Sequence, residues 1–567
     1  MEEPSPKRQR TQLYEKKRAA IACVVCRSRK SKCDGATPQC GFCEAVGAEC
    51  KYVVSGNKQD DSRTSSSSSS TQARLVALEE NVQKLNRTMS VLSAQTQLQL
   101  QQCQLDEAVP TSGNGNGNGN GNGNVQLRHP PATNNFQQSG ILSHMMANID
   151  YDVTGYLTGL ESSQAGWPAA AIVSYPEASE LLNMRLLQTF LDKVHVWYPL
   201  FERQTLQEEY MTVSEEVLAA PSPRVSLCLM ISAIGMLALD LDDGRSHASC
   251  DQATHAAQML YTVIADQSIV GIQCLILHAI YHLLSFRPIQ AYEYVISAAY
   301  KAQNLYKHDI HTRDVVNSES FTRAFYSIYV MERELLVQLN LASSGLRSLE
   351  ENIPLPSGTF ENGQEDGGMC IFFMAEVAIQ KMMEQSDRNF SSSSLQHHNE
   401  IHFPTLVAEE LEFQILEWRS HLPPALAFPD VGFSRGDLSL YLKLQYHAHT
   451  CGIFWLALYK AVITTDQSPE LVSGAEKCVR SYCSFVDAAA DFFSKPVLLP
   501  HIAMTLTSIF TISLSMTFVK NAQVPFGLEQ LDNSFKTAVR VLSRYGTLYP
   551  PVGQWSTVLQ ERLDMKR

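Results

Sequence analysis

Six cysteines near the N-terminus have the spacing of a metal site. They form one Cys-x2-Cys-x6-Cys unit that occurs twice, at Cys23, Cys26, Cys33, Cys40, Cys43 and Cys50. Thiolates at x2 spacing suit Zn2+, because a tight turn brings both sulfurs to one tetrahedral ion. Two such ions need about eight ligand positions, six thiolates are present, and the first histidine is His129. The simplest closed arrangement therefore holds two Zn2+ ions and shares one sulfur from each unit between them.

Two other arrangements of these cysteines are open. A disulfide framework requires an oxidising compartment, yet Met1 to Arg10 is charged and lacks the apolar core of a signal peptide. A single zinc held by four thiolates would leave two thiols over and make no use of the internal repeat. The residues favour the binuclear site. Because this stretch has almost no apolar core, we expect it to fold only as metal binds.

The stretch CVVCRSRKSKCDGATPQCGFCEAVGAEC resembles the fungal binuclear zinc-cluster (Zn2Cys6) transcription factors over its whole length. The likeness rests on the six-cysteine spacing, on the basic run 27–32 and on Pro38, two residues before Cys40. It implies that Cys23 and Cys40 bridge the two metals. It also implies a regulator of RNA polymerase II genes that binds double-stranded DNA at CGG-type half-sites.

The same resemblance assigns roles in DNA binding to the basic run. By position, Lys30 reads bases in the major groove from the end of the first short helix. Arg27, Arg29 and Lys32 lie at or near phosphates. Members of the family often control a metabolic pathway or a biosynthetic gene cluster, so this function, with the transcription machinery as a partner, is expected by analogy.

The distribution of charge agrees with a DNA-binding head. The chain of 567 residues has a formal net charge of −13, but residues 1–58 hold 12 Lys/Arg and 6 Asp/Glu, a net of +6. The remainder of the chain thus carries −19. A basic head on an acidic body is typical of a DNA-binding module joined to a regulatory one.

Residues 1–22 precede the zinc-binding stretch, which we place at 23–52, as a basic arm. The clusters Lys7–Arg10 and Lys16–Arg18 are typical of a nuclear-import signal. A basic arm that only adds phosphate contacts is the alternative. Either interpretation favours the nucleus.

A serine-rich linker at 53–74 leads to a predicted coiled-coil dimerisation helix at 75–105. Apolar side chains recur there at steps of three and four, at Leu75, Leu78, Val82, Leu85, Met89 and Leu92. Valine at position a with leucine at position d favours two parallel strands, and hence a homodimer. The alternative is a lone amphipathic helix that docks on the body.

The remaining chain divides by composition. Residues 106–175, which include six Gly-Asn repeats at 113–124, predict a disordered low-complexity linker. From 176 to 567 long segments with helical apolar spacing predict a large all-α regulatory domain. We expect a loop at Ser391–Ser394 and Pro-rich turns near Pro423–Pro424 and Pro550–Pro551. The apolar run Ile502–Val519 could pass for a membrane span, but its many Ser and Thr residues favour a buried helix, so no membrane partner is expected.

This body resembles the regulatory (middle homology) domain of the same fungal factors, from about 180 to 360. The matching pieces are FLDKVHVWYPLF at 190–201, the segment Ala291–His308, and the segment Ser327–Pro356. The chain departs from the family at residues 340–344, where Asn-Leu-Ala-Ser-Ser replaces a Gly-Arg-Pro-like turn.

Motifs of common enzymes are absent from the sequence, so we expect no enzymatic activity. There is no Gly-x-Ser-x-Gly, His-Glu-x-x-His or Walker-type Gly-Lys-Ser/Thr. His398 and His402 are four residues apart but follow a serine run and precede Pro404, which favours a polar loop over a metal site. Arg333, beside Glu332 and Glu334, is interpreted as a structural ion-pair former.

Two hypotheses follow for the chain as a whole. The first is a zinc-loaded, dimeric, sequence-specific transcription factor whose helical core is large enough for a cavity that binds a small-molecule effector. The second is an α-helical enzyme or effector-binding protein that uses the zinc module only for docking. Zinc-dependent, salt-sensitive binding to CGG-containing duplex would favour the first. Turnover by residues 176–567 alone would favour the second.

Overall fold

The computed structural model describes four residues of the zinc-binding stretch and most of the chain from Tyr151 onward. The described ranges are 39–40, 43–44, 151–163, 181–215, 221–242, 251–309, 318–339, 341–359, 369–394, 403–429, 436–464, 468–494, 500–520 and 528–564. The chain divides into two units, Met1–Ser70 and Thr71–Arg567. The predicted basic arm, serine-rich linker, coiled coil and Gly-Asn repeats lie outside the described residues.

The described part of the second unit consists of helices and their connections, without a strand element. The helices are α5 (Val153–Ser163), α7 (Met184–Lys193), α8 (Arg203–Glu215), α9 (Pro223–Asp242), α10 (Asp251–Gln258), α11 (Leu260–Ala265), α12 (Ile269–Leu284), α13 (Pro288–His308), α14 (Glu319–Gln338), η2 (Leu346–Asn352), α15 (Met369–Ser394), α16 (Thr405–Ser420), α17 (Asp437–Ile463), α18 (Pro469–Phe492), α19 (Ile502–Lys520), α20 (Leu528–Tyr545) and α21 (Pro550–Asp564). The expectation of an all-α regulatory body is confirmed.

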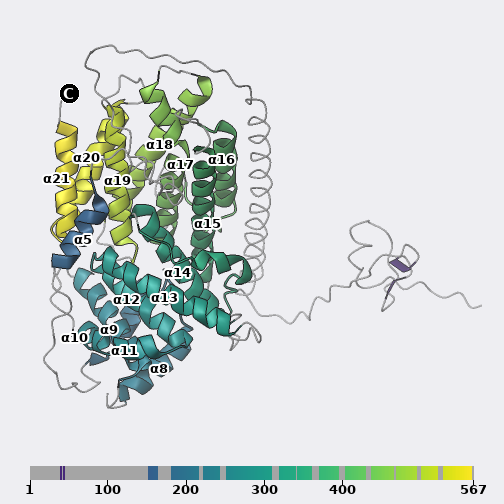
Figure 1. The fold of residues 1–567 in the computed structure, drawn as a ribbon, viewed down its shortest axis with the longest axis vertical. Coiled ribbons are helices and arrows are strands. Elements are labelled where there is room, and N and C mark those ends of the chain that lie inside the picture. The colour runs from purple at the N-terminus through teal and green to yellow at the C-terminus, as the bar shows by residue number, and fades with distance from the viewer. Residues whose placement is uncertain are drawn as a thin grey trace, which may run out of the picture. The chain divides into compact units, whose positions relative to one another are not determined.

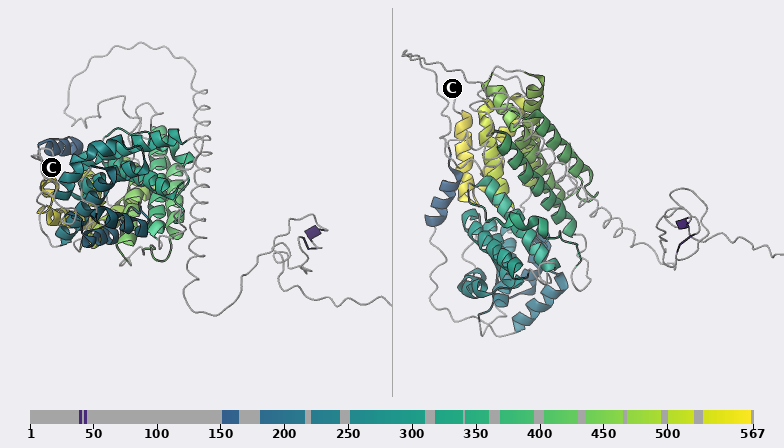
Figure 2. Two further views of the ribbon diagram at one scale, coloured as in Figure 1. Left: turned by 90° about the horizontal axis from the view of Figure 1, so that it is seen from below. Right: turned by 45° about the vertical axis from the view of Figure 1, so that its right-hand side comes forward.

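Helix α14 connects two groups of helices. Helices α8–α13 gather at one end of this unit and α15–α21 at the other (Figures 1 and 2). Within the groups α12 packs on α13, α17 on α18, and α20 on α21. Helix α14 packs on α12 and α13 and also on α15 and α19. Polar groups on α14 can therefore touch elements that are far apart in the sequence.

The start of α14 follows from its sequence. Ser318 precedes the helix with extended backbone, and its Oγ accepts a hydrogen bond from the backbone N–H of Phe321 at 3.2 Å. A serine at this position satisfies one of the N–H groups that a helix start leaves unpaired. Glu319 then places a carboxylate in the first turn, where the helix dipole favours negative charge.

Close packing of α7 on α9 depends on Gly235. A Cβ atom at this position would lie 2.2 Å from the backbone carbonyl oxygen of Leu186. Since backbone atoms cannot yield as a flexible side chain can, only glycine lets the two helices approach this closely. Helix α7 thus packs on α9, and the segment that follows α7 brings Trp197 and Tyr198 into the core.

Within the described ranges two helices are apolar and long enough to cross a membrane by length and composition alone, and both are mostly buried in the protein. They contain the windows Pro223–Asp240, of which 72% is buried, and Ile502–Val519, of which 83% is buried. In α19 the hydroxyls of Thr505 and Thr507 donate to the carbonyls of His501 and Ala503 at 2.8 and 2.7 Å. Because these hydrogen bonds satisfy the hydroxyl groups without water, threonine side chains are tolerated in a buried apolar helix.

The expectation that residues 106–175 form a disordered linker is wrong for residues 153–163. This segment is α5, which packs on α13. The Glu161 carboxylate accepts backbone N–H bonds from Ile289 at 3.0 Å and Gln290 at 2.8 Å, so it caps the start of α13. The Tyr156 hydroxyl donates to Gln554 at 2.6 Å. These tertiary contacts stabilise a helix too short to be stable alone, and local composition does not reveal them.

One predicted loop is also corrected, and two predicted turns are confirmed. Ser391–Ser394 belongs to the last turn of α15, because extending an existing helix is far easier than nucleating one and serine lowers helix stability only modestly. The turn predicted near Pro550–Pro551 is confirmed: Leu548 N donates to Tyr545 O at 3.1 Å in the turn before Pro550, and the two prolines themselves open α21. Proline fits a first turn, where its missing N–H would be unpaired in any case. The predicted turn at Pro423–Pro424 is confirmed, with Leu426 N donating to Pro423 O at 2.9 Å.

Candidate functional sites

The described cysteines of the zinc-binding stretch have the local geometry of a metal-binding turn. Cys40 and Cys43 are both fully buried. The Cys43 N–H donates to the Cys40 sulfur at 3.5 Å, and Glu44 N donates to Cys40 O at 3.0 Å, which forms a single helical turn. An N–H group directed at a sulfur stabilises a thiolate, the form that binds metal. These residues therefore fit a zinc cluster.

The other residues predicted for this site lie outside the described residues. They are the ligands Cys23, Cys26, Cys33 and Cys50 and the DNA-contacting residues Arg27, Arg29, Lys30 and Lys32. His398 and His402 of the weaker metal hypothesis also lie outside.

A second polar centre lies inside the regulatory body, around His501. The ring of His501 lies between two carboxylates: its Nδ1 is 2.9 Å from Oε2 of Glu334, and its Nε2 is 3.6 Å from Oε1 of Glu376. Glu334 comes from α14, Glu376 from α15, and His501 directly precedes α19. All three side chains are buried, which makes their charges interact strongly.

Aromatic rings fix the orientation of His501. The ring of Tyr441 stacks on it with centroids 4.6 Å apart, and Tyr198 lies 5.1 Å away on a tilted plane. Trp197 meets it edge-on at 5.5 Å. With rings packed around it, the imidazole cannot change rotamer without disturbing the core. The Nδ1–H bond to Glu334 adds a polar constraint.

Burial and neighbouring charges shift the pKa values of this centre. Burial, together with the Glu334 charge, raises the pKa of Glu376 to about 8, while His501 acts to lower it. Burial acts to lower the pKa of His501, but Glu334 and Glu376 outweigh it and the pKa is raised. Because each group acts on the pKa of the other, Glu376 and His501 titrate as one coupled set beside the charge of Glu334.

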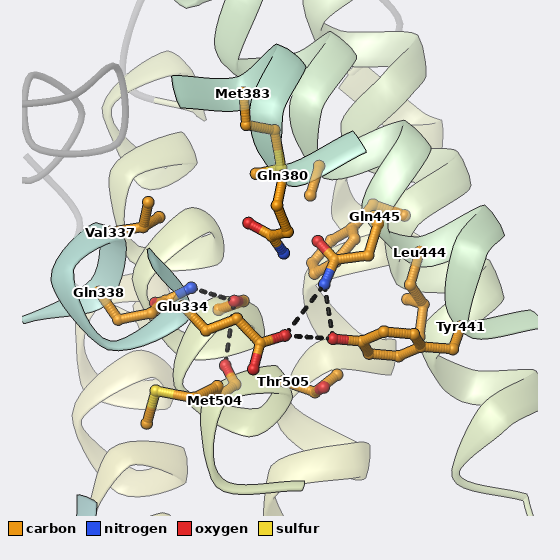
Figure 3. Close-up of a pocket in the computed structure, with 13 residues that line it drawn as sticks. Glu334, Val337, Gln338, Gln380, Met383, Tyr441, Leu444, Gln445, Met504 and Thr505 are labelled. Carbon is orange, nitrogen blue, oxygen red and sulfur yellow. Dashed lines mark hydrogen bonds between the residues drawn. The ribbon is translucent and has the colours of Figure 1, made fainter. Parts of the chain in front are cut away.

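A small cavity of about 40 Å3 adjoins the centre. Its wall includes Glu334, Gln380, Tyr441 and Gln445, with apolar side chains such as Met383 around them (Figure 3). The Tyr441 hydroxyl donates to Glu334 Oε1 at 2.5 Å, and Gln445 Nε2 donates to the Tyr441 oxygen at 2.6 Å. None of the residues that line this cavity is Lys or Arg. The cavity therefore offers oxygen atoms and negative charge.

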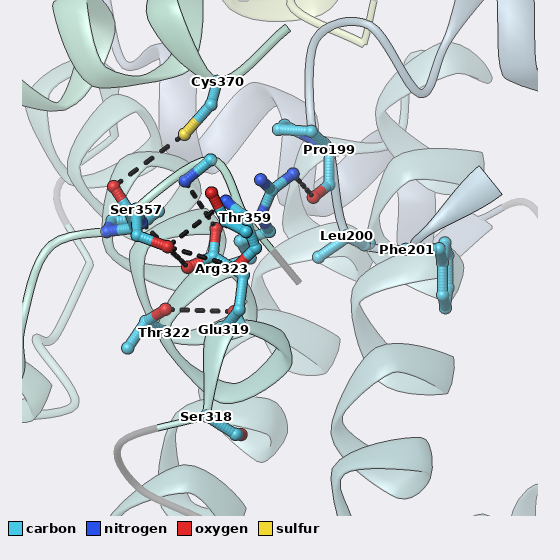
Figure 4. Close-up of polar contacts among 12 residues, drawn as sticks. Pro199, Leu200, Phe201, Ser318, Glu319, Thr322, Arg323, Ser357, Thr359 and Cys370 are labelled. Atoms are coloured by element: carbon cyan, nitrogen blue, oxygen red, sulfur yellow. Dashed lines mark hydrogen bonds and ion pairs between the residues drawn. The ribbon is translucent and has the colours of Figure 1, made fainter. Parts of the chain in front are cut away.

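A buried ion pair at the start of α14 joins three segments. Arg323 Nε donates to Glu319 Oε1 at 2.6 Å, and Arg323 Nη1 donates to the carbonyl of Pro199 at 3.0 Å (Figure 4). The carboxylate also accepts the backbone N–H groups of Ser357 at 2.8 Å and Gly358 at 3.1 Å. The contacts with Pro199 and with residues 357–358 join α14 to two other segments, so the pair connects three parts of the regulatory body.

Glu332 holds the segment 341–344 through hydrogen bonds to its two serines. No local pattern in the sequence predicts this pairing. Ser344 donates its backbone N–H and its hydroxyl to the two carboxylate oxygens, at 2.6 and 2.7 Å. Ser343 Oγ adds a bond at 3.0 Å. Arg333 pairs with Asp387 of α15 at 2.9 Å, which confirms the structural role expected for it, although its partner is distant in sequence. Serines thus anchor the turn that departs from the family pattern.

The residues of the buried centre were not predicted from the sequence. One signal was present: Glu376 is a lone carboxylate within the apolar run Cys370–Ile379, where an uncompensated charge is costly. His501 carried no such signal, because its partners come from helices more than a hundred residues away.

Two family models match the chain. The fungal Zn(2)-Cys(6) binuclear cluster domain matches residues 21–59. The fungal specific transcription factor domain matches residues 187–398.

Relatives among known proteins are of two kinds. The protein ecdB of Aspergillus rugulosus, named as a transcription factor, is 26% identical over 552 residues, which is 89% of this chain and 88% of the relative. Other relatives match only a short stretch. The regulatory protein CAT8 of Saccharomyces cerevisiae is 51% identical over 47 residues, which is 8% of this chain and 3% of that protein. The nitrogen assimilation transcription factor nit-4 of Neurospora crassa is 59% identical over 34 residues, 6% of this chain and 3% of that protein. No solved structure matches the chain.

Proposed function

Because this chain belongs to the fungal Zn2Cys6 transcription factors, we propose that it enters the nucleus and regulates RNA polymerase II genes by reading CGG-type triplets as a zinc-loaded homodimer. The observation that carries this proposal is the repeated six-cysteine unit with a basic run inside it. The domain pair is that of a transcription factor and not of an enzyme. The cluster domain binds two zinc ions, for which the six cysteines are the proposed ligands.

The basic arm and basic run support DNA binding by the head alone. Phosphate neutralisation by Lys and Arg supplies most of the affinity of such contacts and makes it salt-dependent. The acidic remainder of the chain, with a net charge of −19 as the difference between −13 and +6, discourages contacts elsewhere. Selection of bound sequences from random duplexes with the full-length protein tests the CGG assignment directly. Recovery of sequences without such triplets would overturn it.

We place the target genes in a metabolic pathway or biosynthetic gene cluster, with a small-molecule effector acting on the regulatory body. The effector is proposed from the large helical core, in which ligand sites are common; the cavity beside Glu334 has the volume of one or two water molecules, so an effector there would require the surrounding helices to move apart. Mapping of genomic sites bound by the protein checks the class of target genes. Dispersed targets without a shared pathway would contradict it.

Substitution of Lys30 tests which residue reads bases. Lys30→Ala should cost roughly 1–3 kcal/mol on the preferred site and flatten the preference among sequences, because a base contact carries the discrimination. Binding isotherms on matched and mismatched duplexes measure both effects. Both zinc ions should remain bound.

Lys32→Ala is the matched control for this experiment. A phosphate contact carries no sequence information, so its loss should weaken binding to all duplexes alike and reduce the salt slope by about one. If Lys30→Ala left specificity intact, the assignment of the base-reading residue would be wrong.

Substitution of Leu85 tests the proposed dimer helix. Leu85→Pro should abolish cooperative binding to two half-sites, because proline breaks a helix at its centre. A seam of about 18 residues is short for a stable coiled coil, so we expect a weak dimer that DNA with two half-sites strengthens. Analytical ultracentrifugation and two-site binding measure the loss.

Zinc content and single-site affinity of Leu85→Pro should stay near those of the parent, which separates dimer loss from misfolding of the head. Glu80→Ala, on the same predicted helix but outside the apolar seam, is the control and should leave two-site binding intact. Unchanged sedimentation and two-site affinity for Leu85→Pro would indicate that the helix docks on the body or that the factor acts as a monomer.

A further inference from the structure

Unpaired acceptor atoms gather beside His501. Glu376 is fully buried, and neither of its carboxylate oxygens has a hydrogen-bond partner among the described residues. Gln380, one helical turn further along α15, is 1% exposed, and its Oε1 has no such partner within the described ranges either. The same holds for Nε2 of His501. A buried polar atom without a protein partner is satisfied by an ordered water or an ion, and here several such acceptor atoms belong to neighbouring residues of α15 and to His501.

The positions of these atoms fit a cation. Oε1 of Glu376 and Nε2 of His501 are 3.6 Å apart. Two ligand atoms on one tetrahedral zinc, at about 2.0–2.2 Å each, lie roughly 3.4 Å apart. One donor atom from each of Glu334, Glu376 and His501 can be chosen so that all lie within 4.8 Å of one another. The separation is thus near that of two ligands on one ion and beyond that of a hydrogen bond.

Glu334 supplies the supporting contact that metal-binding histidines normally have. Its carboxylate lies 2.9 Å from Nδ1 of His501 and favours the tautomer that carries the proton there, and in that tautomer Nε2, 3.6 Å from Glu376, keeps its lone pair for a metal ion. A carboxylate in this position fixes the tautomer and raises the basicity of the imidazole. Glu334 itself is held by the hydroxyl of Tyr441 at 2.5 Å.

Gln380 adds an oxygen on the side of the cavity. Its amide is directed into the cavity beside Glu334 and Gln445 (Figure 3). No basic side chain lines that cavity and could pair with the carboxylates. A divalent cation with two carboxylates and a neutral imidazole is electrically neutral as a whole, which a buried site requires.

We infer that the regulatory body holds a divalent transition-metal ion, with zinc as the working case, between Glu376 and His501, with Glu334 as the positioning residue for His501. The ligand types, imidazole and carboxylate oxygen, suit Zn2+ and its neighbours better than Ca2+ or Mg2+. The ion would tie α15 to the segment that opens α19. This site is separate from the six-cysteine cluster, and it does not depend on the DNA-binding proposal.

The test is the zinc content of the full-length protein after removal of loosely bound metal. Three zinc ions per chain are expected, two in the cluster and one here, and Glu376→Gln should reduce the number to two. Glu384→Gln is the matched control: it removes a buried carboxylate two turns away on α15 that already pairs with Arg347 at 2.7 Å, so it should retain three. Glu334→Gln should lower the affinity of the third ion about 10- to 100-fold.

X-ray absorption at the zinc edge identifies the third ion independently. The difference between the parent and Glu376→Gln should contain nitrogen and oxygen scatterers only, since all sulfur ligands belong to the cluster. Titration of zinc should raise the unfolding temperature of the parent and leave that of Glu376→Gln unchanged. Two zinc ions in the parent at saturating zinc, or a third ion that survives in both Glu376→Gln and His501→Gln, would overturn the inference. The zinc content of the parent and the effect of zinc on its unfolding temperature test the inference even if a variant fails to fold.

Discussion

Cys40→Ala should abolish zinc loading of the N-terminal cluster and, with it, specific DNA binding. We expect a loss of at least about 10³-fold on the preferred site, which is the usual gap between specific and non-specific binding. Cys40 is a proposed bridging ligand, so its removal affects both ions. Its sulfur is fully buried and accepts the Cys43 N–H bond, so alanine also removes the contact that closes the turn. A module that lacks an apolar core has no other source of stability.

A comparison of alanine variants at different cysteines tests which sulfurs bridge the two zinc ions. Cys23→Ala should equal Cys40→Ala, whereas Cys50→Ala should have a smaller effect, because a terminal thiolate serves one ion only. Cys483→Ala, at a buried thiol of α18, is the control and should change neither zinc content nor DNA affinity. Zinc analysis and binding isotherms on the same preparations measure these differences. Equal losses for Cys23, Cys40 and Cys50 would contradict the bridge assignment, and one zinc in the cluster would contradict the shared-thiolate arrangement.

The zinc cluster and the all-α fold class could be predicted from the sequence because both depend on local patterns. Cysteine spacing specifies ligands within a short stretch, and helical apolar periodicity identifies α9, α12, α13 and α14 without knowledge of their partners. Helix α5 was missed for the opposite reason. Its stability comes from Glu161 at the start of α13 and from Tyr156 against α21, contacts that span more than a hundred residues.

The buried centre marks the limit of prediction from sequence. Glu334, Glu376 and His501 come from three elements, and only the packing of α14, α15 and α19 brings them together. Arg333 was recognised as structural, but its partner Asp387 was not, and neither was the pairing of Glu332 with the serines at 343 and 344. A charged residue in an apolar helix predicts that a partner exists. It does not predict which one, because tertiary contacts are not encoded in local spacing.

Glu319→Gln should destabilise the regulatory body by about 3–5 kcal/mol, the range for breaking a buried ion pair by removing one partner. The Arg323 side chain is fully buried and Glu319 is 6% exposed, so solvent cannot replace the lost interaction. Glutamine preserves the size of the side chain but leaves the guanidinium without its carboxylate. The amide also accepts more weakly than a carboxylate from Ser357 and Gly358, whose N–H groups hold the turn beside α14 (Figure 4).

The measurement is urea unfolding followed by tryptophan fluorescence, with the double variant Glu319→Gln, Arg323→Met completing the cycle. If the cost arises from an uncompensated buried charge, the double variant should be more stable than the sum of the single variants predicts, by about 0.5–3 kcal/mol. Glu412→Gln is the control, because its partner Lys477 is 34% exposed and the pair lies at 2.6 Å near the surface. Its loss should cost less than about 1 kcal/mol. Equal costs for the buried and the partly exposed pair would show that burial does not set the strength of the Glu319–Arg323 pair.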